Sequence, residues 1–243
     1  MIVSGIVQAD RMIGRSRTPR EAAAQSRADR ASGILPHPVD DEIPALPVLW
    51  ARWATMAATF VAAGSPGGPR IVPSVAWYES AQGGGSTLTL LPGGRAVLSG
   101  GMDHSARCAT TAALFAGAPH WVADPVLNRR AEQGVLAFCY WWQPVAGGRW
   151  FRGESAPPRR FGTAMPGVWT ADTVIRTVAG AVARYPNEPG RTAAALLLTA
   201  AEVGVVTAGT VHSVFGRRVD FDTDGALLQF SLAGLVATVP VTG

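Results

Sequence analysis

The sequence Ala137-Phe138-Cys139-Tyr140-Trp141-Trp142 gathers four aromatic rings and a cysteine near the middle of the chain, and Trp150-Phe151 follows after a short loop that contains glycine. Successive side chains of a strand point to opposite faces of a sheet, and here both sets are apolar. Such a strand is buried on both faces, or buried on one face and used for contact on the other. The sequence therefore predicts a β-hairpin with strands over residues 135–142 and 149–152.

Further strand signals precede this hairpin, and helical signals lie on both sides of it. Residues 70–78 and 86–91 carry β-branched or aromatic side chains, and Pro92-Gly93-Gly94 turns the chain into a strand over 95–99. These links are too short for a crossover, so the strands are expected to pair antiparallel. Helical periodicity and capping residues predict helices over 47–63, 105–115, 121–133, 172–185, 191–203, 207–215 and 225–238.

The order of these elements predicts an α+β fold. We expect an antiparallel sheet of about four to six strands packed by helices, with a helical C-terminal third. Residues 1–44 are rich in arginine, alanine, serine and aspartate, and a short helix over residues 20–30 would lack an apolar stripe. We therefore expect a flexible or weakly ordered tail over 1–44 and a single α+β domain over 45–243.

The amino-acid composition indicates the compartment of the protein more clearly than its activity. All 21 basic residues are arginine and the formal net charge is +4, but the arginines are scattered, so nucleic-acid binding is not expected although the charge permits it. Cys108 and Cys139 make neither a disulfide framework nor a zinc knuckle, which favours free thiols in a reducing compartment. The most apolar segment, 193–211, contains Glu202 and many small residues and is a poor bilayer span. We expect a cytoplasmic protein with no membrane segment.

Candidate catalytic groups are few. His104 and Cys108 lie four residues apart on a predicted helix and share a face, with Asp103 beside them, as in a Cys-His pair or a metal corner. Glu79 follows Trp77-Tyr78 at a strand end, where a carboxyl group can serve as a general acid. In the structural alternative, Asp103 caps the helix, Cys108 packs inward and Glu79 is solvated. No ligand pair, phosphate loop or nucleophile motif accompanies them, so neither a metal nor a cofactor is expected.

The aromatic residues of the hairpin allow a second kind of site. Tyr140, Trp142 and Trp150 belong to residue types that are enriched at protein interfaces, and Arg149 lies next to them in the sequence. In the alternative, the same rings fill the space between the sheet and its helices.

Three segments carry a resemblance to known proteins. They are Leu91-Pro92-Gly93-Gly94-Arg95-Ala96-Val97-Leu98, Asp103-His104-Ser105, and Leu114-Phe115-Ala116-Gly117-Ala118-Pro119-His120-Trp121. Together they resemble actinobacterial immunity-type proteins of polymorphic toxin systems, over roughly residues 90–142 and more faintly over 191–216. The resemblance implies an inhibitor that binds a cognate toxin and performs no chemistry. Immunity proteins that block basic nucleases tend to be acidic, whereas this chain is basic, so its partner is acidic or the resemblance reflects a shared fold.

The leading expectation is a non-enzymatic cytoplasmic binding protein, of the immunity or inhibitor kind, that holds a cognate toxin through the hairpin. Its partner-binding residues are expected to be Tyr140, Trp142, Arg149 and Trp150. The alternative is a small enzyme acting on an anionic or aromatic metabolite near the sheet edge. Its candidate residues are Glu79, Asp103, His104 and Cys108.

Overall fold

The computed structural model describes residues 37–39, 43–81, 83–101, 111–133, 135–144, 147–154, 164–183 and 187–237. The strands are β1 (His37–Val39), β2 (Arg70–Val72), β3 (Val75–Glu79), β4 (Gly85–Leu91), β5 (Arg95–Gly101), β6 (Phe138–Gln143) and β7 (Arg149–Arg152). The helices are α2 (Leu46–Ala62), α3 (Thr111–Phe115), α4 (Pro125–Glu132), α5 (Ala171–Val182), α6 (Glu188–Glu202), α7 (Ala208–Phe215) and α8 (Thr223–Leu232). The α+β class with a helical C-terminal third is therefore confirmed.

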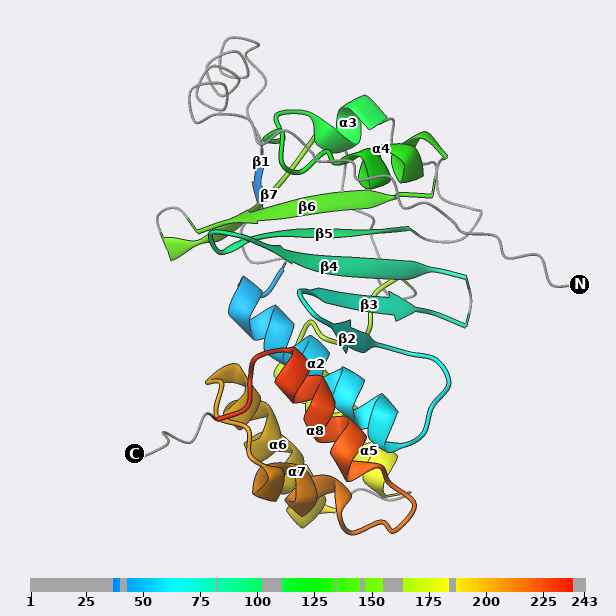
Figure 1. The fold of residues 1–243 in the computed structure, drawn as a ribbon, viewed down its shortest axis with the longest axis vertical. Coiled ribbons are helices and arrows are strands. Elements are labelled where there is room, and N and C mark those ends of the chain that lie inside the picture. Colours follow the sequence, from blue (N-terminus) through cyan, green and yellow to red (C-terminus); the bar gives the residue numbers. More distant parts are fainter. Residues whose placement is uncertain are drawn as a thin grey trace, which may run out of the picture. The chain divides into compact units, whose positions relative to one another are not determined.

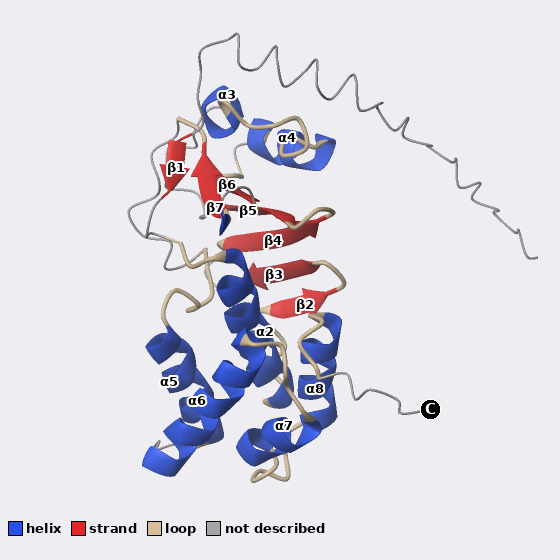
Figure 2. Cartoon of the chain, turned by 90° about the vertical axis from the view of Figure 1, so that its left-hand side faces the viewer, coloured by secondary structure: helices blue, strands red, loops and turns tan. Residues whose placement is uncertain are grey.

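One antiparallel sheet contains all of these strands, in the order β1-β7-β6-β5-β4-β3-β2. Six strands come from residues 70–152, where the sequence predicts the sheet. Figure 1 shows α3 and α4 above β6 and β7, and α5, α6, α7 and α8 below β2, while α2 begins at the level of the sheet and runs down among them. Figure 2 shows α2 leading from the sheet into the layer formed by α5, α6, α7 and α8.

The seventh strand, β1, comes from the segment predicted to be a tail. Residues 37–39 pair antiparallel with β7, so that Val39 lies opposite Trp150. The indole Nε1–H of Trp150 also donates a hydrogen bond of 2.8 Å to the carbonyl oxygen of Pro44. The partner of this short strand is more than a hundred residues away in sequence, so the local pattern of residues 1–44 gives no sign of the pairing.

Residues 70–78, predicted as one strand, form the two strands β2 and β3 with a tight turn between them. Pro73 supplies the fixed φ that suits the first central position of a turn. Ser74 takes the second position at a φ of 63°, in the left-handed region. Glycine is the usual residue at this position of a turn, and serine is uncommon there. The sequence therefore gives no sign that the strand is interrupted at Ser74.

Strand β6 is buried on both faces, which decides between the two alternatives that its sequence allows. Phe138, Tyr140 and Trp142 belong to a core that also contains buried residues of α2. Cys139 and Trp141 point to the other face and join a second core with Leu114 of α3 and Leu127 of α4. The sheet thus has an apolar cluster on each side of β6, and its rings have no free face.

The C-terminal helices pack around α2, which contacts α5, α6 and α8. Most of the α2 side chains are buried, and the small alanines among them let neighbouring helices approach closely. The chain leaves α6 and α8 through equivalent turns at Gly204 and Gly234, with φ of 72° and 71°. A parallel bridge between Val206 and Val236 then joins the two segments that follow these turns.

Each edge strand of the sheet has a feature that hinders pairing with a further strand. At one edge, the backbone N–H of Ile71 in β2 donates a hydrogen bond of 2.8 Å to the side-chain oxygen of Gln229, which is buried on α8. At the other edge, β1 is three residues long and contains Pro38, which has no N–H to donate. Short, proline-bearing or covered edges limit edge-to-edge association.

Candidate functional site

The structure places the three aromatic residues proposed for partner binding inside the protein. Tyr140 and Trp150 are each 1% exposed and Trp142 is 8% exposed. The rings of Trp142 and Trp150 meet edge to face, with centroids 5.4 Å apart. These rings occupy the core position that the sequence left open as the alternative to an interface. Of the four proposed binding residues, Arg149 alone has an exposed side chain.

Arg149 belongs to a polar row across three adjacent strands. Gln143 of β6 lies directly opposite Arg149 of β7. Arg95 of β5 is the next residue beyond the Ala96–Trp142 pair, which puts it beside Gln143 in register. Paired residues of antiparallel strands share a face. We call Arg95, Gln143 and Arg149 the arginine row.

The arginine row lies on the face of the sheet that α3 and α4 cover. Two residues along the strands are Val97, Trp141 and Phe151, which all pack in the second core. The Arg95 guanidinium lies over the ring of Trp121, 5.1 Å from its centroid, and its Nε–H donates a hydrogen bond of 2.8 Å to the carbonyl oxygen of Pro92. Because one strand lies between β5 and β7, the backbones of Arg95 and Arg149 are roughly 10 Å apart.

No sequence pattern identifies Arg95 and Trp121 as members of a site. Arg95 is the last residue of a turn, and its place beside Gln143 depends on pairing between segments nearly fifty residues apart. The resemblance did include both residues, but only as parts of structural motifs.

The candidate catalytic groups are not assembled in the part of the chain that the structure describes. Glu79 is exposed at the end of β3, opposite Gly85. Asp103, His104 and Cys108 lie outside the described residues. Within the described ranges, no three histidine, cysteine, aspartate or glutamate side chains are grouped in a way that could hold a metal ion.

Cys139 is fully buried within the second core. Burial in apolar surroundings raises the pKa of its thiol to about 12, and the negative charge of Asp124 acts in the same direction. A thiol with this pKa stays protonated near neutral pH. Because the thiolate is the nucleophilic form, Cys139 is a core residue rather than a reactive group.

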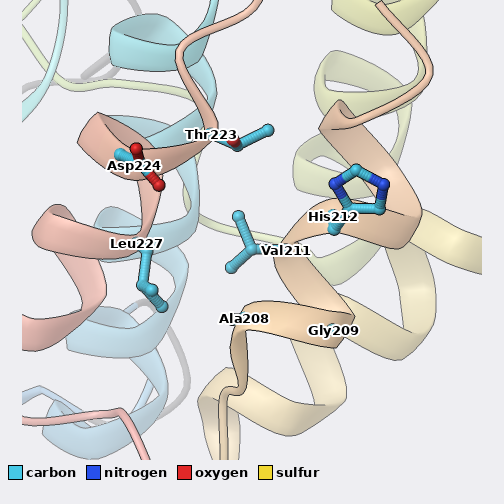
Figure 3. Close-up of a pocket in the computed structure, with 7 residues that line it drawn as sticks. All are labelled: Ala208, Gly209, Val211, His212, Thr223, Asp224 and Leu227. Carbon is cyan, nitrogen blue, oxygen red and sulfur yellow. The ribbon is translucent and has the colours of Figure 1, made fainter.

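A hollow of about 390 Å³ lies where the first turns of α7 and α8 meet (Figure 3). Val211 and Leu227 supply apolar walls, while His212 and Asp224 supply polar groups at the rim. Both polar side chains are exposed, and neither makes a hydrogen bond or an ion pair among the described residues. The hollow can admit a small molecule, but nothing in its lining selects one chemistry. The sequence signals at this place are the helix caps Thr207 and Asp222.

Searches among known proteins give no match for this chain: no protein-family model, curated protein or solved structure is similar to it. Among the described residues, the helices are too short or too polar to cross a membrane.

Proposed function

We propose that this chain is a non-enzymatic binding protein that holds a protein partner at the turn end of the β6–β7 hairpin. The main support for this proposal is the arginine row. Within it, the exposed Arg149 extends from a hairpin whose aromatic rings are packed on both faces of the sheet. A surface held rigid by its core loses little conformational entropy on binding, which favours affinity. Arginine is also among the residue types enriched at the energetic centres of interfaces.

In its specific form, the proposal is that the protein acts in the cytoplasm as an inhibitor of a cognate toxin. The resemblance of residues 90–142 to immunity-type proteins supports a toxin as the partner. The cysteine content of the sequence favours a reducing compartment. The aromatic residues of the hairpin then serve as the scaffold, and the residues at its end serve as the contact.

The experiment uses the full chain as bait in a lysate of the native host, followed by purification of each captured protein. Isothermal titration then compares the wild type with Arg149→Ala and with Arg217→Ala, an exposed arginine after α7 that serves as the matched control. We expect Arg149→Ala to weaken binding at least tenfold, about 1.4 kcal/mol, and Arg217→Ala to leave it unchanged. Equal affinities for all three proteins would place the contact elsewhere and overturn the proposal.

A further inference from the structure

We infer that the arginine row recognises carboxylate groups, so that the partner is a protein with an acidic surface. This inference rests on the proposed binding function and adds the chemistry of the partner. Two observations support it: the two guanidinium groups of the row have donors free to bind a ligand, and the excess positive charge falls in one stretch of the sequence.

Both guanidinium groups of the row are available to a carboxylate. Within the described residues, Arg149 is exposed and makes no hydrogen bond or ion pair. Arg95 uses Nε for the Pro92 carbonyl and lies over Trp121, which restrains the plane of the group; its two terminal nitrogens make no hydrogen bond or ion pair with the described residues. A guanidinium whose plane is already held loses less freedom when it forms two parallel hydrogen bonds to a carboxylate.

The excess of arginine over acidic residues falls in the stretch of sequence that contains the arginine row. Residues 82–163 contain eight of the 21 arginines and four of the 17 acidic residues, so this segment carries the whole net charge of +4. The remaining 13 arginines are balanced by 13 acidic residues. Asp124 is the acidic residue nearest in sequence to Trp121, and its Oδ1 accepts hydrogen bonds from the N–H groups of Val126 and Leu127 at the start of α4.

An acidic protein fits this pattern better than a nucleic acid does. Nucleic-acid sites usually place many cations along a continuous track, since each contacted phosphate adds to the affinity. Here the backbones of two arginines lie roughly 10 Å apart, with the neutral residue Gln143 between them in register. Two separate carboxylates with an uncharged group between them match this spacing.

The test measures binding of fluorescent poly-L-glutamate and of a fluorescent 20-base-pair DNA duplex by anisotropy, with the full chain at low and at physiological salt. We expect poly-L-glutamate to bind, with an affinity that falls as salt rises. Arg149→Glu should weaken this binding at least tenfold, whereas Arg217→Glu, with the same change of charge, should change it less than twofold. Arg95→Gln, which keeps a polar side chain over Trp121, should weaken it by an intermediate factor.

Two results with these probes would overturn the inference. The first is equal weakening by Arg149→Glu and Arg217→Glu, which would show a response to total charge alone. The second is tighter binding of the DNA duplex than of poly-L-glutamate with the same dependence on Arg149, which would assign the row to phosphate. Neither result would decide whether the protein partner binds through Arg149, which the titration with Arg149→Ala measures. A partner that loses affinity with Arg149→Ala but binds independently of salt would retain the binding function and reject the carboxylate chemistry.

Discussion

Trp150 joins three parts of the fold through one side chain. Its backbone pairs with Val39 of β1, its ring packs edge to face on Trp142, and its Nε1–H reaches the carbonyl of Pro44. A large ring at 1% exposure contributes through burial, and its polar atom is satisfied as well. Its neighbour Arg149 has none of these contacts. Adjacent residues of one strand thus divide between holding the fold and facing solvent.

Substitutions at these two neighbouring residues should therefore differ greatly in their effect on the stability of the protein. Trp150→Ala should lower the free energy of unfolding by about 3–5 kcal/mol, because it leaves a large cavity and an unpaired carbonyl at Pro44. Arg149→Ala should change it by less than about 0.5 kcal/mol, as is usual for an exposed side chain. Urea unfolding followed by circular dichroism measures both. A Trp150→Ala protein as stable as the wild type would contradict the packing of this hairpin.

The thiol of Cys139 predicts a dependence on pH. Its pKa in the folded protein is about 12, above the ordinary value of 9.0, so at pH between these values the unfolded chain releases a proton that the folded chain keeps. Stability from this group is therefore complete below pH 9 and falls as the pH rises toward 12.

The measurement uses a Cys108→Ser background, so that Cys139 is the remaining cysteine. The native protein should react with a thiol reagent at pH 8 far more slowly than the urea-unfolded protein, because the folded state holds the thiol protonated and covered. Cys139→Ala in the same background should show a smaller loss of stability between pH 9 and 11. Rapid modification of the native thiol at pH 8 would mean that the second core opens.

At the scale of the element, the turns after α6 and α8 show why some glycines are required and others are not. Gly204 has a φ of 72°, yet no atom lies within 4 Å of the position that a Cβ would occupy. The restriction there is conformational rather than steric. Gly180 lies in α5 at an ordinary helical φ, and its Cβ position is also open. The two positions differ in backbone geometry alone.

Substituting alanine for these two glycines should change the stability of the protein in opposite directions. Gly204→Ala should destabilise the protein by about 1–2 kcal/mol, because a side chain disfavours the left-handed conformation. Gly180→Ala should stabilise it by about 0.4–1 kcal/mol. Alanine gives the unfolded chain less backbone freedom than glycine does, so less is lost on folding, and alanine also favours the helix. Thermal unfolding of the two variants compares them directly. Destabilisation by Gly180→Ala would reveal a contact on the exposed face of α5.

The elements with strong local patterns could be predicted from the sequence, and those defined by distant partners could not. Apolar periodicity and a following glycine predict a helix over 47–63, and α2 spans Leu46–Ala62. The turn at Ser74 is invisible because serine is rare at positive φ, and β1 is invisible because its pairing depends on β7. The sequence could not tell core from interface for Trp142, since this depends on how many layers cover the sheet.

At the scale of the whole molecule, the net positive charge falls in one part of the sequence. Residues 82–163, the part of the sequence that includes β4 to β7, α3 and α4, hold eight arginines and four acidic residues. Residues 164–243, which include α5 to α8, hold five arginines and six acidic residues. One ion pair helps to join the helices: the Arg52 Nε lies 3.1 Å from Glu202 Oε1, and the same guanidinium donates to the carbonyl of Trp169. The stretch of sequence with the net positive charge is thus distinct from the stretch whose helices pack around α2.

The sheet edges give the last prediction. A compact unit begins at Leu35, and the residues before Ile43 within it include β1. A chain that starts at Ile43 lacks β1, so the N–H and C=O groups of β7 that pair with it lie open at the edge. Exposed edges of this kind pair with other chains. Compared with a chain that starts at Leu35, this shorter chain should unfold at a lower temperature and should associate as its concentration rises.

Analytical ultracentrifugation and thermal unfolding of these two chains test this expectation, since they differ by residues 35–42 alone. A third protein, the longer chain with Val39→Pro, serves as the control for sequence length, because proline removes the backbone N–H that a β1 residue can donate. If β1 protects the edge, this variant should shift toward the behaviour of the chain that starts at Ile43. If all three proteins stay monomeric with equal melting temperatures, β1 has no protective role, and the β7 edge must be shielded by its twist and short length.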